Sequence, residues 1–118
     1  MKLIKNQEFA LIVRAVFEDS EEAGFKALKE RKLFDAKADS SFPMLDEDGQ
    51  GTIYYGLGQS DKIDAYKATL FFHNLGKYLQ KLKLSQIHLV VPESVKEDSE
   101  LSAKVFEGLY QAERVKVC

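Results

Sequence analysis

Short runs of apolar and β-branched residues predict the strands of this chain. The run Phe9–Phe17 is apolar at every position except Arg14, which is typical of a strand largely buried on both faces. Further strands are predicted at Thr52–Tyr55 and at Gln86–Val91, where Pro92 ends the run. Residues 40–45 contain a proline and predict a short edge strand, and the acidic, glycine-containing stretch 46–51 predicts a turn.

Apolar residues at steps of three and four predict a long helix after the second of these strands. Ser60 or Asp61 is a suitable N-cap for it. Lysines mostly occupy the other face of this helix. The predicted apolar stripe consists of Ile63, Tyr66, Leu70, Phe71, Leu75, Tyr78, Leu79 and Leu82.

Helices are also predicted after the first and the last strand. Asp19 or Ser20 is a candidate cap for the first, and Gly24 disfavours it. Its expected apolar face is Ala23, Ala27, Leu28 and Leu33. The last helix is expected to begin near Asp98 or Ser99, and Gly108 within it permits either a close approach to the sheet or an early end. Its stripe is Leu101, Val105, Phe106, Leu109 and Ala112.

The order of these elements predicts an α/β fold with a mainly parallel sheet. Strands alternate with helices, which is the pattern of a sheet whose strands are joined by crossover helices. We expect the crossover from Tyr55 through the long helix to Ile87 to be right-handed and to join parallel strands. No repeat or linker interrupts the 118 residues, so we expect a single domain over residues 1–118.

Composition and charge argue against several classes of protein. Hydrophobic residues make up 45% of the chain and charged residues 31%, which is ordinary for a globular domain. A formal net charge of −2 makes nucleic acid an unlikely partner, because such binding usually needs a basic face. Cys118 is the single cysteine, so the chain has no internal disulfide. Apolar runs are too short for a secretion signal or a membrane span, and we expect a cytoplasmic protein.

The segment Gly56-Leu57-Gly58 is the main candidate for a ligand-binding loop, because it lies between a strand and a helix. A dinucleotide fingerprint needs a third glycine, and Asp61 stands there with a charge that repels phosphate. Tight packing is therefore the favoured interpretation of Gly56 and Gly58, with a ligand loop as the alternative. Asp46 and Asp48 suggest a calcium loop only faintly, since Leu57 occupies the twelfth position, where an acid is needed.

The two histidines, His73 and His88, have no acid or cysteine at metal-ligand spacing. A structural role is the favoured interpretation for both. No carboxylate pair or nucleophile motif can be assembled either. The residues themselves therefore assign no catalytic and no metal site.

Several segments have an order and spacing that point to a known family. Residues Tyr54–Gln59 precede the long helix, Leu82–Pro92 contain a strand that closes in proline, and Phe106–Ala112 contain Glu-Gly-Leu on a helix. Phe9–Phe17 and Leu33–Ala38 fit the same series. Together these segments resemble the amino-terminal domain of the leucyl (cytosol) aminopeptidase family, over most of residues 9–112.

The resemblance implies a macro-domain-like fold, in which a mixed sheet lies between helix layers. It implies a non-catalytic domain whose parent is a metallo-aminopeptidase, with two divalent metals, zinc or manganese, in a carboxy-terminal catalytic domain absent from this chain. No cofactor is expected in the chain itself. Its partners would be its own catalytic domain and like subunits, because the family forms hexamers in which this domain contributes to assembly and active-site access. The chain begins with methionine and stops where the family's linker would begin.

Two alternatives remain open. The first is a stand-alone macro-like module that would bind ADP-ribose or another nucleotide through the loop at Gly56 and Gly58. The second is a free-standing interaction protein. The interaction protein would assemble through the sheet edge or the long helix.

Overall fold

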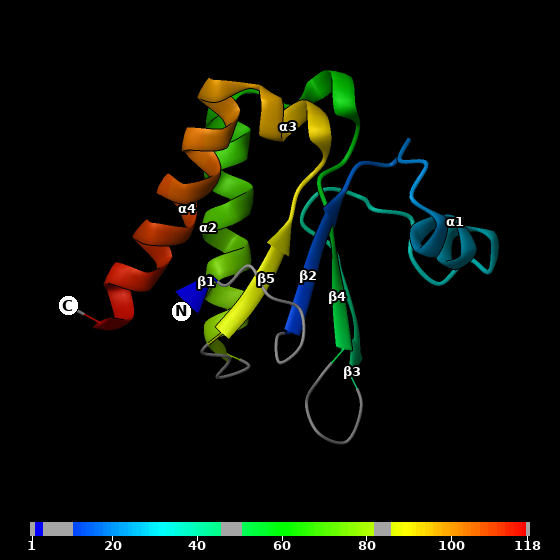
Figure 1. Cartoon of the computed structure of the whole chain (residues 1–118), viewed down its shortest axis with the longest axis horizontal. Coiled ribbons are helices and arrows are strands. Elements are labelled where there is room, and N and C mark those ends of the chain that lie inside the picture. The colour runs from blue at the N-terminus through cyan, green and yellow to red at the C-terminus, as the bar shows by residue number, and fades with distance from the viewer. Residues whose placement is uncertain (1, 4–10, 46–50, 82–85, 118) are drawn as a thin grey trace.

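The chain forms a mixed, mainly parallel sheet of five strands flanked by helices (Figure 1). This computed structural model describes residues 2–3, 11–45, 51–81 and 86–117, and side chains at 12–44, 51–81 and 88–109. The strands are β1 (Lys2–Leu3), β2 (Leu11–Val16), β3 (Ser41–Leu45), β4 (Gly51–Gly56) and β5 (Gln86–Val90). The helices are α1 (Ala23–Glu30), α2 (Ala65–Lys81), α3 (Glu93–Glu97) and α4 (Ser99–Val117), with a 3₁₀ turn, η1 (Ser60–Lys62). The arrangement is α/β, as predicted, and is compatible with a macro-domain-like fold.

The strands follow the order β1-β5-β2-β4-β3 across the sheet. The central strand β2 pairs in parallel with both β4 and β5, so α2 connects two parallel strands, as expected. The edge strand β3 is antiparallel to β4 and contains Pro43, which an edge position tolerates. Because β2, β4 and β5 run in the same direction, their carboxyl ends meet at one edge of the sheet (Figure 1).

Alternate strand residues pack into separate cores on the two faces of the sheet. Val13 and Tyr55 belong to the core beneath α2 and α4, which also receives Val95 from α3. Val16 and Tyr54 belong to the core on the opposite face, beneath α1. The helices therefore form layers on both sides of the sheet, as a macro-domain-like arrangement requires. No helix in the described ranges is both long and apolar enough to cross a bilayer.

The long helix begins later than the sequence predicts. Ser60 and Asp61 form the 3₁₀ turn, and the N-cap of α2 is Asp64, whose carboxylate accepts from the Lys67 N–H at 2.8 Å. The predicted apolar stripe is also wrong in part, since Tyr66 is 73% exposed and Leu70 40% exposed. The residues of α2 that are buried are Ala68, Phe72, Leu75, Gly76 and Leu79. Because apolar residues such as Leu70 and Phe72 lie close together in the sequence, two different faces of this helix could be the buried one. Packing against the sheet buries the face that contains Phe72.

Helix α1 is likewise capped by a residue that the sequence pattern did not indicate. Its N-cap is Glu22, rather than Asp19 or Ser20. The buried residues are Phe25 and Leu28. The remaining predicted members of the stripe are exposed: Ala23, Ala27 and Leu33.

The last helix begins at Ser99, as predicted, and Asp98 caps it by accepting from the N–H groups of Glu100 and Leu101 at 3.0 and 3.1 Å. Phe106 is 54% exposed, so its place in the predicted stripe is wrong. The helix continues past Gly108 to Val117, which excludes an early end. A Cβ at Gly108 would lie 2.4 Å from the Thr69 carbonyl oxygen, so the close approach is to α2 and not to the sheet.

Other predictions agree with the structure or fall outside it. Strand β2 ends at Val16, one residue before the predicted limit, and β5 ends at Val90. Helix α3 was not predicted. Predictions at residues 9–10, 46–50 and 82, and for the side chain of Ala112, lie outside the described residues.

Candidate functional site

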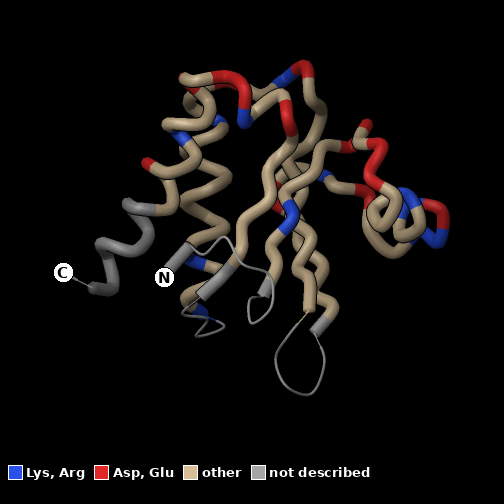
Figure 2. The backbone as a smooth tube through the Cα atoms, in the orientation of Figure 1, with Lys and Arg blue, Asp and Glu red and all other residues tan. Residues whose placement is uncertain are grey.

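A pocket of about 330 Å³ lies at the carboxyl ends of β2 and β4. Such an edge is where open α/β sheets bind ligands, because helices and loops leave a crevice beyond the strand ends. Charged residues gather around this edge and around α1, whereas the strands themselves carry few (Figure 2). The apolar part of the wall comes from four separate segments: Ala38, Leu57, Ile63 and Phe71.

Of the predicted loop residues, Gly58 lines the pocket and Gly56 does not. Gly56 is required by packing, since a Cβ there would lie 2.2 Å from the Lys37 carbonyl oxygen. Gly58 adopts a φ of +77°, which favours glycine. The segment that packs against both glycines is 36–40.

The backbone N–H groups of this loop already have acceptors. Gly56 donates to Ser40, Leu57 to Val16 and Gly58 to Ala36, at 2.8 to 3.0 Å. A phosphate-binding loop needs free N–H groups that point at the ligand. Any ligand of this pocket must therefore be held by side chains and not by the amides of Gly56, Leu57 and Gly58.

The rim of the pocket carries charges of opposite sign on opposite segments. Glu18 follows the end of β2, and its N–H donates to the Gly58 carbonyl oxygen at 2.9 Å. Lys62 and Lys67 belong to η1 and α2. The Lys67 ammonium donates to the Lys62 carbonyl oxygen at 3.0 Å. No ion pair links Glu18 to either lysine within the described part of the chain.

A polar network lies beside the pocket, under α2. The Tyr55 hydroxyl donates to the Asp39 carboxylate and also lies 2.9 Å from the Phe71 carbonyl oxygen. Asn74 donates to the other carboxylate oxygen at 3.3 Å. Burial raises the pKa of Tyr55 well above its ordinary value, and the hydrogen bond and charge of Asp39 raise it further. A tyrosine held in its neutral form in this way ties the 36–40 segment to β4 and α2.

The histidines lie on different elements, α2 and β5, and neither is among the described residues that line the pocket. His73 is partly buried on α2, and its Nδ1 has no hydrogen-bond partner in the described part of the chain. His88 is partly buried on β5, in register with Ile12. Within the described residues, no three His, Cys, Asp or Glu side chains converge on a point where a metal ion would sit.

Sequence reasoning missed most of the pocket. The sequence pattern places the lysines, Lys62 and Lys67 among them, on the face of the long helix opposite its apolar stripe, and it assigns no role to Glu18. Their shared position follows from strand ends meeting at one edge, which no local pattern indicates. The strand-to-helix position of Gly58 was the one usable signal.

Comparison with known proteins gives one informative match. No known protein-family model matches the chain. It is 30% identical, over 93 residues, to a protein of Treponema denticola named "Probable cytosol aminopeptidase". The chain is thus distantly similar to a cytosol aminopeptidase. The match covers 78% of this chain and 20% of the Treponema protein, so the chain spans about a fifth of that relative. This similarity agrees, at a coarse level, with the aminopeptidase resemblance of the sequence.

Proposed function

We propose that this chain is a non-catalytic domain of the cytosol-aminopeptidase type, equivalent to the amino-terminal part of such enzymes. It would contribute to subunit assembly and to access to the active sites. Peptide-bond hydrolysis at the substrate's amino terminus would belong to a separate carboxy-terminal domain that holds two zinc or manganese ions. The observation that carries the proposal is the match to most of this chain but only a fifth of the aminopeptidase.

The side chains of the pocket support a non-catalytic role. Hydrolysis of a peptide bond needs an activated water or a nucleophile with an adjacent base. Glu18, Lys62, Lys67 and Gln59 line the pocket together with apolar groups, and the described lining residues include no histidine, cysteine or serine. Binding is a more suitable function for this set of groups than bond cleavage.

Exposed apolar side chains on α2 support a role in assembly. Tyr66 and Leu70 are 73% and 40% exposed, and their spacing places them on the same face of the helix. Aromatic and large aliphatic residues on a surface are common at contacts between subunits. We therefore propose that this face of α2 contacts its own catalytic domain or a like subunit, in the cytosol.

The test is the mass of the native protein in its source cells, measured with an antibody against this domain. A band far larger than 13.4 kDa would support the proposal, and a band at 13.4 kDa would overturn it. In the larger protein, Tyr66→Ser with Leu70→Ser should lower the native mass in light scattering. Lys81→Ser, at an exposed position on the same helix, is the control. Purified chain that hydrolyses an aminoacyl substrate with added manganese would also contradict the proposal.

A further inference from the structure

We infer that the pocket between Glu18 and Lys67 binds a free hydrophobic amino acid in its zwitterionic form. The inference stands on the pocket alone and goes beyond the proposed function. A site for such a ligand needs an apolar surface for the side chain, an acid for the ammonium group and a cation for the carboxylate. Groups of all three kinds line the pocket.

The apolar surface lies at the base of the pocket. Leu57 is 1% exposed, and Ile63 and Phe71 are partly buried around it. Pockets for drug-sized ligands measure about 300–1,000 Å³. A pocket of about 330 Å³ is at the lower end of this range, which suits a leucine-sized molecule better than a dinucleotide.

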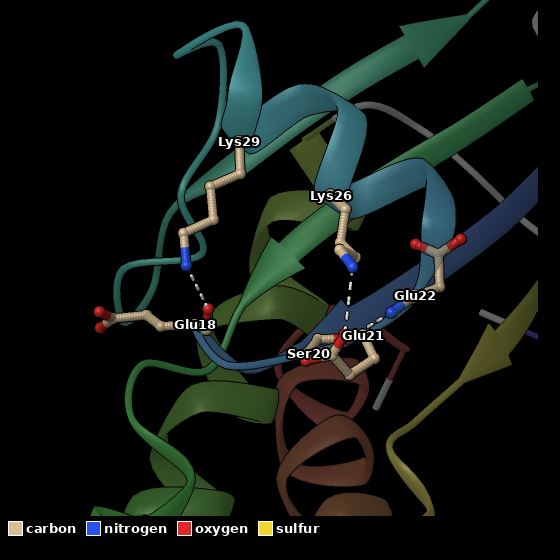
Figure 3. A network of polar contacts seen from close by, with 6 residues as sticks. All are labelled: Glu18, Ser20, Glu21, Glu22, Lys26 and Lys29. Carbon is tan, nitrogen blue, oxygen red and sulfur yellow. Dashed lines mark hydrogen bonds and ion pairs between the residues drawn. The ribbon is translucent and has the colours of Figure 1, made fainter.

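The negative side of the site is Glu18. Both backbone polar groups of this residue form hydrogen bonds. Its N–H donates to the Gly58 carbonyl oxygen, and its own carbonyl oxygen accepts from the Lys29 ammonium, each at 2.9 Å. Figure 3 shows the Glu18 carboxylate directed away from the Lys26–Glu21 ion pair and from the Ser20 hydroxyl, which accepts from the Glu22 N–H. In the described residues this carboxylate has no ion-pair partner, so it is available to an ammonium group.

The positive side is Lys67, with Lys62 beside it. One hydrogen of the Lys67 ammonium is used by the Lys62 carbonyl oxygen, which leaves two for a ligand. Lys62 is exposed at the mouth of the pocket and supplies a second positive charge. An ammonium group and a carboxylate on one small ligand would each meet the opposite charge, and charge-assisted hydrogen bonds of this kind are strong.

A nucleotide fits this arrangement poorly. Its phosphates would meet the Glu18 carboxylate at the rim, and the amides of Gly56, Leu57 and Gly58 already have acceptors. An acid and a cation that line one small pocket together with apolar side chains match the ammonium group, the carboxylate and the side chain of an amino acid instead.

The first test is calorimetry of the purified chain with L-leucine and analogues that each lack one feature. L-leucine should bind with a stoichiometry of one. N-acetyl-leucine, leucine amide and glycine lack the ammonium group, the carboxylate and the side chain in turn, and each should bind about tenfold more weakly or worse. Absence of heat with L-leucine, equal affinity for all four compounds, or tight binding of ADP-ribose in its place would overturn the inference.

The second test uses variants with a matched control. Glu18→Gln should weaken leucine binding about tenfold and should no longer discriminate against N-acetyl-leucine. Lys67→Met should also weaken leucine binding about tenfold, and it should no longer discriminate against leucine amide. Lys77→Gln changes an exposed lysine of α2 outside the pocket and should leave affinity unchanged. Leucine affinity that is unaffected by both pocket variants would place the ligand elsewhere. These outcomes are independent of the native mass that tests the proposed function.

Discussion

The hydroxyl of Tyr54, on strand β4, donates a hydrogen bond of 3.1 Å to the Glu22 carboxylate that caps helix α1. The same carboxylate accepts from the N–H groups of Gly24 at 3.0 Å and Phe25 at 2.8 Å. Burial raises the pKa of Tyr54, and the charge and hydrogen bond of Glu22 raise it further. Gly24 leaves the space for this contact, since a Cβ there would lie 2.3 Å from the Tyr54 oxygen. One carboxylate therefore both starts α1 and fastens it to the sheet.

Glu22→Ala should lower the free energy of unfolding by about 2 kcal/mol. Loss of an N-cap costs about 1 kcal/mol, and loss of the hydrogen bond from Tyr54 costs about 1 kcal/mol more. Urea unfolding followed by circular dichroism measures this change. Tyr54→Phe should cost about 1 kcal/mol, and the double variant should cost less than the sum of the two single changes.

Glu21→Ala is the matched control for Glu22→Ala. Glu21 is 86% exposed and pairs with Lys26 at 3.2 Å (Figure 3). Exposed ion pairs contribute at most about 1 kcal/mol and often nothing measurable. Equal destabilisation by the two alanine substitutions would show that Glu22 has no special role.

Gly56→Ala should destabilise the fold much more than Gly58→Asn. A Cβ at Gly56 would lie 2.2 Å from the Lys37 carbonyl oxygen and 2.6 Å from the Ala36 carbonyl carbon, and backbone atoms cannot easily shift. Such overpacking costs about 3 kcal/mol. At Gly58 the nearest atom would be Ala38 Cβ, at 3.2 Å, and asparagine tolerates the φ of +77° at a cost of about 1 kcal/mol. Thermal unfolding of both variants tests this order, and the reverse order would contradict it.

The strands and the order of elements could be predicted because buried strands leave a local signal. The run at Leu11–Val16 is apolar at every position except Arg14, and Pro92 closes β5 at the expected place. The helix starts at Glu22 and Asp64 could not be predicted, because several nearby acids and serines are equally good caps by type. Packing against the sheet decides which of them begins the helix.

The candidate site could be predicted only at Gly58. Its other groups, and the polar network beside it, are brought together by tertiary structure. Tyr55 bonds to Asp39, which lies 16 positions away, and Asp39 bonds to Asn74, 35 positions away. Asp39 also has a φ of +64°, which its residue type permits but does not require. No spacing along the chain indicates contacts of this kind.

Gly108→Ala should destabilise the chain although alanine favours a helix. The added methyl group would lie 2.4 Å from the Thr69 carbonyl oxygen and 2.8 Å from the His73 nitrogen. Overpacking of about 1–3 kcal/mol should exceed the gain of about 1 kcal/mol in helix propensity. Ala103→Gly, at an exposed position of the same helix, measures the propensity effect alone and should cost about 1 kcal/mol. A more stable Gly108→Ala variant would show that α2 and α4 are not in close contact at this point.

The stability of the chain should fall as the pH rises above about 10, and Tyr55 should account for much of this fall. Tyr55 is 2% exposed, and burial and its bond to Asp39 raise its pKa. The unfolded chain releases the hydroxyl proton near pH 10, whereas the folded chain retains it. The contribution of Tyr55 to the free energy of unfolding is therefore complete below that pH and is lost progressively above it.

Urea midpoints measured from about pH 8 to pH 11 test the role of Tyr55. Tyr55→Phe should lower stability at pH 8, because Asp39 loses a hydrogen-bond donor, and should make the alkaline decline shallower. Some decline should remain, because the pKa of Tyr54 is also raised. Tyr66→Phe, at a position that is 73% exposed, is the control and should leave the wild-type curve unchanged. An alkaline decline in Tyr55→Phe as steep as in the wild type would mean that the Tyr55 proton is not held by the fold.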